Sequence, residues 1–366
     1  MPNAKVSTCV VSLTLLFLGI PLVVAKAQPP TPAPAQAALS KSQQQIGQGT
    51  GDASQKQDAA GQEDERSQFD QDKAFAHLEA VCEFGPRISA KRGMKKQQQY
   101  LEKHFKKIGG KVLNQPFQAR SPFDGRPSKL HNLIVQYHPE RERRLLICCH
   151  YDTRPFADMD PVNPRGKFIG ANDGASGVAL LCELGRHMSD LEGPYGVDFI
   201  FFDGEEYVIN RANDPMFLGS TYFAQQYAAG QVPWKYEYGI LVDMVADKDL
   251  QIYYEGNSLS FDGGDRLSRS IWGVAKQLEI DEFIPEKRHQ IRDDHLPLNQ
   301  IARIPVCDII DFDYPNPKAG NIYWHTTEDK PENCSAESLG KVGKVVLEWI
   351  RQMQELNKNV EQPKKK

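Results

Sequence analysis

The sequence predicts an α/β fold built around a mostly parallel sheet. Short, continuously apolar runs such as 145–149 (LLICC) and 197–202 (VDFIFF, with one acidic residue) are typical of strands that are buried on both faces. Segments with helical spacing alternate with these runs, which favours an α/β arrangement over an all-β or all-α one. Acidic residues and histidines follow several of the runs, at the strand ends where binding sites of parallel sheets lie.

The expected elements can be given in chain order. Two helices at 70–83 and 91–108 come first, joined by a turn-forming FGPR sequence. Strands are expected at 133–137, 145–149, 197–202, 239–245 and 304–310. Further helices are expected at 175–189, 218–229, 260–278 and 335–356.

The first 27 residues have the features of a secretory signal peptide. Lys5 precedes an apolar stretch at 10–25, and a small-residue AKA site follows at 25–27. An uncleaved membrane anchor is the alternative, but the stretch is short for a spanning helix and contains a glycine and a proline. We therefore expect an exported protein, secreted or periplasmic, without stable membrane association.

The remainder of the chain divides by composition. Residues 28–67 are rich in Gln, Ala, Pro and Ser, and we expect a disordered linker because they cannot bury enough apolar surface to fold. A single globular domain is expected at 68–358, and a solvated basic tail at 359–366.

Charge and cysteine content exclude some classes of site. The formal net charge is -4 and no basic stripe is present, so no nucleic-acid partner is expected. The seven cysteines include no CxxC pair, which argues against a cysteine zinc site. Cys148, Cys149 and Cys307 lie in apolar runs and are expected to be ordinary core residues.

Acidic residues and histidines cluster at the ends of the predicted strands. A buried charge is costly unless a partner compensates it, and a divalent metal ion is the simplest partner for such a set. The set is His150, Asp152, Asp173, Glu205, Glu206, Asp243, Asp293, Asp294, His295 and His325.

Several of these residues have a plainer interpretation when taken alone. Asp173 precedes a predicted helix and could be its N-cap. Glu205 and Glu206 could form a solvated surface pair, or one could bind a metal while the other moves a proton. A lone histidine in a loop, such as His325, is more often structural.

Two other acids are expected to need a partner. Asp152 is two residues from His150 and is expected to orient its imidazole ring. Asp243 lies in an otherwise apolar strand and needs a partner that is distant in sequence.

Taken together, these motifs resemble the M28 family of zinc-dependent exopeptidases. The resemblance covers about Phe69 to Leu356 and rests on FGPR, HYD, NDG, FFDGEE, LGS, DDH, and WHT followed by Asp329. It implies one catalytic α/β domain of three layers, with a twisted, mixed, largely parallel sheet between helices.

The resemblance also assigns roles to individual residues. Matched to the family pattern, Asp173, Glu206 and His325 are zinc ligands and Glu205 is the general acid/base. Zinc accepts such a mixture of carboxylate and imidazole ligands with one position left open.

The family contains two chemistries, both on peptide or protein N-termini. Aminopeptidases hydrolyse the first peptide bond with two zinc ions, and His150 and Asp243 would complete the second site with Asp173 bridging. Glutaminyl-peptide cyclotransferases use one zinc ion and convert N-terminal glutamine to pyroglutamate with release of ammonia. The five ligand positions are alike in both branches, so the ligands alone do not choose between them. A monomer is the default expectation.

Two residues outside the ligand set favour the cyclotransferase branch. Asp293 adds a second aspartate before Asp294, where aminopeptidases commonly carry a small residue. In the cyclotransferases it hydrogen-bonds with the residue matching Asp243, near the catalytic glutamate. Trp324 matches a tryptophan that walls the pocket for the flat glutamine side chain. The plainer alternatives are a surface acid for Asp293 and ordinary loop packing for Trp324.

Two departures from the animal cyclotransferases weigh against this interpretation. Those enzymes usually have serine at the position of Gly174 and histidine at the position that matches Asp308. Cyclotransferase activity is therefore the expected function, with a two-zinc aminopeptidase as the alternative. A non-catalytic zinc-binding module is a third interpretation, disfavoured because Glu205 is retained.

Overall fold

A computed structural model of the chain describes residues 68–315 and 323–356. The predicted signal peptide, linker and basic tail lie outside these ranges. Within them, none of the helices has both the length and the apolar character that crossing a membrane requires.

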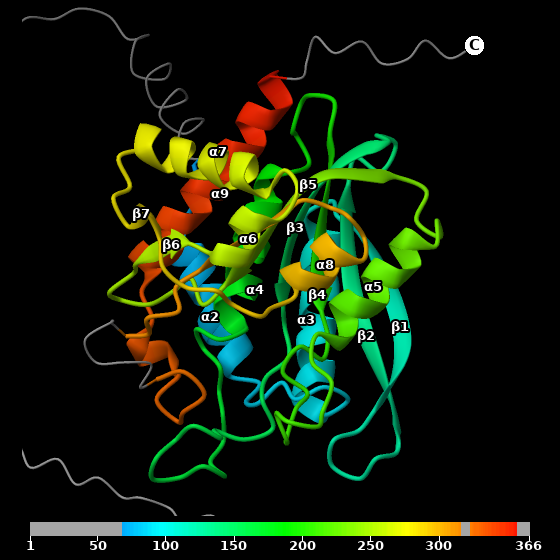
Figure 1. The fold of residues 1–366 in the computed structure, drawn as a ribbon, viewed down its shortest axis with the longest axis vertical. Coiled ribbons are helices and arrows are strands. Elements are labelled where there is room, and N and C mark those ends of the chain that lie inside the picture. Colours follow the sequence, from blue (N-terminus) through cyan, green and yellow to red (C-terminus); the bar gives the residue numbers. More distant parts are fainter. Residues whose placement is uncertain (1–67, 316–322, 357–366) are drawn as a thin grey trace, which may run out of the picture. The chain divides into compact units, whose positions relative to one another are not determined.

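The centre of the domain is a mixed sheet of six strands in the order β1-β2-β4-β3-β5-β8 (Figure 1). The strands are β1 (Lys111–Arg120), β2 (Pro127–Tyr137), β3 (Arg143–His150), β4 (Gly196–Phe202), β5 (Lys235–Asp243) and β8 (Val306–Ile310). Strand β3 pairs in parallel with β4 and β5, and β5 pairs in parallel with β8. The pairs β1–β2 and β2–β4 are antiparallel. The predicted α/β fold with a mixed, largely parallel sheet is confirmed.

Strand β3 shows why the buried strands are continuously apolar. Its Leu145, Ile147 and Cys149 side chains join the hydrophobic core on one face of the sheet. The alternate residues Leu146 and Cys148 join a second core on the other face. Because successive side chains point to opposite faces, a strand covered on both sides needs apolar residues at every position. The predicted core location of the cysteines in this strand is confirmed.

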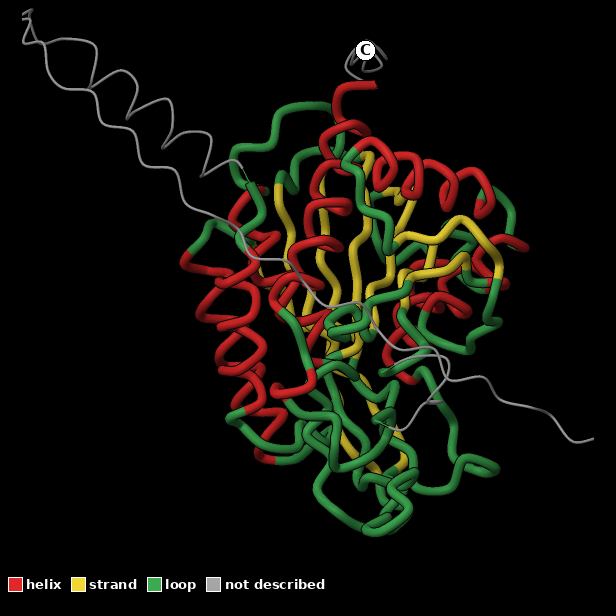
Figure 2. Tube along the Cα trace, turned by 90° about the vertical axis from the view of Figure 1, so that its left-hand side faces the viewer, coloured by secondary structure: helices red, strands yellow, loops and turns green. Residues whose placement is uncertain are grey.

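Helices cover both faces of the sheet (Figure 2). They are α2 (Gln71–Cys82), α3 (Arg92–Lys107), α4 (Ala175–Leu184), α5 (Leu218–Ala228), α6 (Gly256–Ser260), α7 (Gly264–Gln277), α8 (His295–Gln300) and α9 (Ala336–Leu356). Helices α2, α3, α4, α7 and α9 contribute to the larger core, and α5 and α8 contribute to the smaller one. The domain therefore has the three layers that the family resemblance implied.

Some elements were not predicted from the sequence. Strand β1 lies at the edge of the sheet, and only one of its ten residues is buried, so it lacks the apolar pattern of the inner strands. Helix α8 has six residues and contains Pro297. A small parallel sheet of β6 (Ile252–Tyr254) and β7 (Phe283–Lys287) is also present. Short elements such as these give too few residues for a periodic pattern.

The parallel strands fix the position of the site. Strands β3, β4, β5 and β8 all end at the same edge of the sheet, at His150, Phe202, Asp243 and Ile310. The loops that follow these ends carry the acidic residues and histidines singled out above, as expected for an α/β sheet.

Candidate active site

The predicted ligand residues come together at the carboxyl edge of the sheet. His150 and Asp243 are the last residues of β3 and β5, and Glu206 lies in the loop that follows β4. Asp173 lies just before α4, and His325 lies in the loop that leads to α9. All five side chains are buried.

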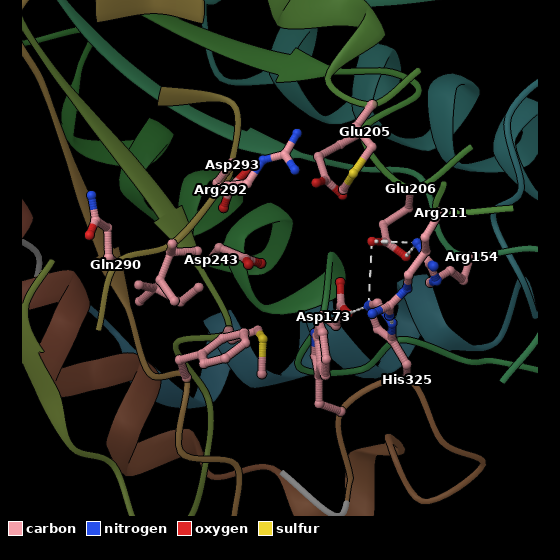
Figure 3. Close-up of a pocket in the computed structure, with 16 residues that line it drawn as sticks. Arg154, Asp173, Glu205, Glu206, Arg211, Asp243, Gln290, Arg292, Asp293 and His325 are labelled. Carbon is pink, nitrogen blue, oxygen red and sulfur yellow. Dashed lines mark hydrogen bonds and ion pairs between the residues drawn. The ribbon is translucent and has the colours of Figure 1, made fainter. Parts of the chain in front are cut away.

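Asp173, Glu206 and His325 form one compact group that could hold a metal ion (Figure 3). The Nε2 atom of His325 is 3.2 Å from Asp173 Oδ2 and 3.4 Å from Glu206 Oε1. One potential ligand atom from each of the three residues lies within 4.8 Å of the others. The carboxylates and the imidazole therefore face a common point.

His150, Asp173 and Asp243 form a second group of the same kind. His150 Nε2 is 3.2 Å from Asp173 Oδ1 and 3.1 Å from Asp243 Oδ1. The two oxygens of Asp173 thus face different groups, in the arrangement that a bridging ligand between two metal sites would need.

The residues of the first group fit a zinc ion. Asp173 Oδ2 is buried, and no described residue forms a hydrogen bond with it, although His325 Nε2 lies 3.2 Å away as an ion-pair partner. A buried carboxylate oxygen left in this state is costly, and a cation removes the cost. Carboxylate and imidazole are also ordinary zinc ligands.

Without an ion, the same charges hold a proton on His325. Burial disfavours the charged ring, but Glu206, Asp158 and Asp173 outweigh this and raise the pKa of His325 to about 10. A ligand histidine must be neutral, so zinc binding has to displace this proton.

Gly174 has a structural reason to be glycine. Its φ of +98° lies where side chains are strained, and a Cβ there would lie 2.9 Å from the backbone oxygen of Asp152. The same Cβ would lie 3.1 Å from His150 Cε1. This departure from the animal cyclotransferases therefore follows from the local backbone and does not by itself indicate a different reaction.

Asp152 holds the backbone of the two glutamates. Its Oδ1 accepts a hydrogen bond from the N–H of Glu205 and its Oδ2 accepts one from the N–H of Glu206, both at 3.1 Å. His150 Nδ1 is 3.9 Å from Asp152 Oδ1, which is longer than a hydrogen bond. The main partners of Asp152 are thus the glutamate amides and not the imidazole that it was expected to orient.

Asp329 holds the loop of Asp173 in a similar way. Its two oxygens accept hydrogen bonds from the N–H groups of Asn172 and Asp173, at 2.7 and 3.1 Å. The hydroxyl of Tyr314 donates a third at 3.2 Å. The orientation of Asp173 therefore depends on a residue that is more than 150 positions away in the sequence.

Glu205, Asp243 and Asp293 form an acidic cluster at the cavity. Burial, with the charges of Glu206 and Asp293, raises the pKa of Glu205 well above its usual range. Burial, with the charges of Asp243 and Asp294, does the same for Asp293. Crowded carboxylates of this kind share protons, which suits groups that carry a proton during a reaction.

Asp308 lies deeper, in the middle of β8, and is fully buried. Its Oδ2 is 3.5 Å from His295 Nδ1, and the Nε2 atom of the same ring is 3.3 Å from Glu255 Oε2. Burial, with the charge of Asp293, raises the pKa of Asp308 well above its usual range. Asp308 thus extends the acidic cluster behind the cavity.

Trp324 lies against the metal-binding group. Its ring stacks on His325 with the centroids 4.0 Å apart and packs edge-on against Phe312 at 5.1 Å. The guanidinium of Arg211 lies 4.9 Å from the centre of the indole. Trp324 therefore has packing contacts, as the plainer alternative expected, and also forms part of the cavity wall.

A cavity of about 360 Å³ opens over these residues. The predicted residues that line it are Asp173, Glu205, Glu206, Asp243, Asp293, Trp324 and His325. Its volume lies in the range usual for small-ligand sites. His150 does not line the cavity but contacts Asp173 and Asp243. Asp152, Asp294 and His295 do not line it either.

Three charged residues that contact the predicted ligands Glu206 and His325 were not predicted. Arg154 Nη1 donates to Glu206 Oε1 at 3.2 Å and Arg154 Nε donates to Asp158 Oδ1 at 2.9 Å. Asp158 Oδ1 is 3.4 Å from His325 Nδ1, and Arg211 also contacts that nitrogen. In the sequence these residues look like ordinary charges of solvated loops, and only the fold brings them to the ligands.

Asp158→Asn is expected to weaken zinc binding. The change removes the negative charge beside His325, and loss of such a supporting carboxylate lowers metal affinity roughly tenfold to a hundredfold. Competition with a chelator of known affinity measures the effect. The matched control is Asp281→Asn, an exposed aspartate that does not line the cavity. Equal zinc affinity in both variants would contradict the assigned role of Asp158.

Comparisons with known proteins show which family and which solved structures this chain is similar to. The sequence profile of peptidase family M28 matches residues 132–350. The crystal structure of Fimbriiglobus ruber glutaminyl cyclase superposes with a TM-score of 0.71 at 37% identity, over 77% of this chain and 95% of that chain. A leucine aminopeptidase precursor from Bacteroides thetaiotaomicron superposes with a TM-score of 0.70 at 34% identity, over 78% of this chain and 97% of that chain.

A relative named glutaminyl-peptide cyclotransferase is also similar in sequence, at lower identity. The glutaminyl-peptide cyclotransferase of Gloydius blomhoffii is 25% identical over 277 residues, which are 66% of this chain and 71% of that protein. The family profile covers more than half of the chain, and the sheet and the ligand residues follow the arrangement expected from the motifs. The chain therefore belongs to peptidase family M28.

Proposed function

We propose that this protein is a zinc-dependent glutaminyl-peptide cyclotransferase, which converts N-terminal glutamine of peptides or proteins to pyroglutamate. The observation that carries the proposal is the position of Asp293, buried beside the cavity with Glu205 and Asp243. Solved relatives that are named glutaminyl cyclases support it, at 37% identity for the protein of Fimbriiglobus ruber.

Asp173, Glu206 and His325 would hold the zinc ion of this enzyme. Bound there, zinc would polarise the oxygen of the glutamine γ-carboxamide and make its carbon more electrophilic. Arg154 and Asp158 keep Glu206 and His325 in place through the contacts described above.

Glu205 would carry the proton of the reaction. The substrate α-amine forms a bond to its own γ-carbonyl carbon, and the bond from that carbon to the amide nitrogen breaks. Glu205 takes a proton from the attacking amine and gives it to the departing nitrogen, which leaves as ammonia. A carboxyl whose pKa is raised by burial and by neighbouring acids can serve in both directions.

Asp243 and Asp293 would support this proton transfer, and Trp324 would hold the substrate. The two aspartates line the same cavity as Glu205, and crowded carboxylates of this kind can share protons. The indole of Trp324 offers a flat wall to the glutamine side chain. Ring closure is intramolecular, so holding the side chain in a folded conformation supplies much of the rate.

Aminopeptidase activity is the second candidate. It is favoured by the His150, Asp173 and Asp243 group, whose geometry also fits a second metal ion. The solved leucine aminopeptidase precursor with 34% identity supports this alternative as well.

The decisive experiment compares two peptides that differ only in the first residue. Purified protein is incubated with zinc and a peptide that begins with glutamine or with leucine, and the products are analysed by mass spectrometry. We expect the glutamine peptide to lose one ammonia and the leucine peptide to stay intact. Release of free leucine without cyclisation of the glutamine peptide would establish the aminopeptidase instead.

Asp293→Ala is expected to lower cyclisation strongly. The variant removes a proton-sharing partner of Glu205, and contributions of this kind to proton transfer are worth roughly a hundredfold in kcat. Steady-state kinetics with a glutamine peptide measures the loss, and Asp281→Ala is the exposed control. An aminopeptidase should be less affected, so near wild-type activity in Asp293→Ala would count against the cyclotransferase.

We also propose that the enzyme acts after export, outside the cell or in the periplasm. The proposal rests on the apolar stretch at 10–25 and its small-residue cleavage site, which lie outside the described residues. N-terminal sequencing of the mature protein tests for cleavage after residue 27.

A further inference from the structure

Arg292 is an exposed cation at the edge of the cavity. It immediately precedes Asp293, it lines the cavity, and its side chain is open to solvent. Figure 3 shows it on the side of Asp293 and Asp243, across from Arg211 and His325.

The other arginines at the cavity are already engaged. Arg154 pairs with Glu206 at 3.2 Å and with Asp158 at 2.9 Å. Arg211 lies 3.4 Å from Asp158 and stacks over the indole of Trp324. For Arg292, by contrast, no ion pair is found within the described parts of the chain.

Nearby acids do not neutralise Arg292. Asp293 is buried, and its Oδ1 accepts a hydrogen bond from the N–H of Asp294. Asp313, the acid that faces the same loop, pairs with Arg288 at 2.9 Å and with His289 at 3.0 Å. Arg292 therefore keeps its positive charge available at the cavity mouth.

A bound peptide would bring its second residue toward this charge. The N-terminal glutamine would fill the cavity with its side chain at the buried ligand group and its α-amine near Glu205. The chain beyond the first residue then has to leave through the open side, where Arg292 is an exposed lining residue with no ion pair to another described residue.

We infer that Arg292 makes this enzyme select peptides in which an acidic residue follows the N-terminal glutamine. The inference rests on the proposed cyclotransferase function and names the substrate class of that site. The attraction acts on binding and on encounter, because the second residue takes no part in ring closure. The preference for an acidic second residue should have the magnitude of an exposed charge pair, roughly threefold to fivefold in kcat/KM.

The test uses three peptides with the first two residues Gln-Glu, Gln-Gln and Gln-Lys and the same sequence after them. The zinc-loaded full-length protein is compared with Arg292→Gln, Arg292→Glu and the control Arg269→Gln. Arg269 is an exposed arginine of α7 that does not line the cavity, so its variant makes the same charge change elsewhere. Cyclisation is followed by ammonia release at low and at high salt.

The expected result is a preference for Gln-Glu over Gln-Lys in the wild-type protein and in Arg269→Gln. Arg292→Gln should lose this preference through a higher KM for Gln-Glu, with kcat nearly unchanged and Gln-Gln unaffected. Arg292→Glu should reverse the preference. High salt should weaken the preference in the wild-type protein because the charges are exposed.

The outcomes that overturn the inference are distinct from failure of the proposed function. The role of Arg292 is contradicted if the wild-type protein and Arg292→Gln have the same selectivity. It is also contradicted if Arg292→Gln loses kcat/KM equally on all three peptides. Cyclisation itself stands in both cases. Absence of cyclisation of every glutamine peptide by the wild-type protein removes the proposed function, and the inference falls with it.

Discussion

Glu205→Gln is expected to lower kcat for cyclisation by roughly a thousandfold, within the range for loss of a general acid/base. Glutamine keeps the shape and the backbone contact to Asp152 but cannot carry a proton. Because Glu205 is not one of the zinc ligands in the proposed site, zinc content should remain that of the wild-type protein. Steady-state kinetics and metal analysis on the same preparation measure both quantities.

The control for this variant is Glu286→Gln. Glu286 is an exposed residue of β7 that does not line the cavity, so its loss should leave kcat unchanged. Retention of more than about a tenth of the activity in Glu205→Gln would assign the proton transfer to another group. Loss of zinc from the same variant would place Glu205 among the ligands.

Asp173→Ala is expected to abolish zinc binding and activity together. Asp173 belongs to both groups of potential ligands, with one oxygen 3.2 Å from His325 Nε2 and the other 3.2 Å from His150 Nε2. No other carboxylate of the described site contacts both histidines in this way, so the variant leaves neither group complete. Metal analysis after dialysis, and kcat on a glutamine peptide, measure the two losses.

Removal of the metal from the wild-type protein provides the reversible counterpart. Treatment with a chelator should abolish activity, and added zinc should restore it in the wild-type protein but not in Asp173→Ala. His150→Ala distinguishes a site for one zinc ion from a site for two. About one zinc ion per chain in both the wild-type protein and this variant supports a single site. A fall from two to one would support the aminopeptidase arrangement. Full activity after complete zinc removal would contradict a metal enzyme.

Much of the fold was predictable because local patterns reflect burial. The run at 145–149 is apolar at every position because β3 is covered on both faces. This continuous apolar pattern identified β3 as an inner strand of a mostly parallel sheet. The charges at the strand ends stood out against this background. Strand β1 was missed for the opposite reason, since an edge strand with exposed residues resembles a polar loop.

The members of the site were predictable to a similar extent. Asp173, Glu206 and His325 belong to short motifs, and the structure brings all three to one point. Asp158 and Arg292 carry no motif, and each reads as a solvated charge in the sequence. Their importance comes from residues that are distant in the chain. Asp158 contacts His325, and Arg292 lines the cavity.

By itself, the sequence determined the α/β architecture and the family, because strand burial and family motifs are properties of short segments. The residues proposed to hold zinc were assigned through the resemblance to that family. Only the tertiary structure decided how these residues are used. It placed Asp173 between two histidines and made Asp152 the support of both glutamates. It also left Arg292 exposed at the cavity without an ion pair among the described residues. Distances between side chains far apart in sequence set these relations, and no local pattern of residues contains them.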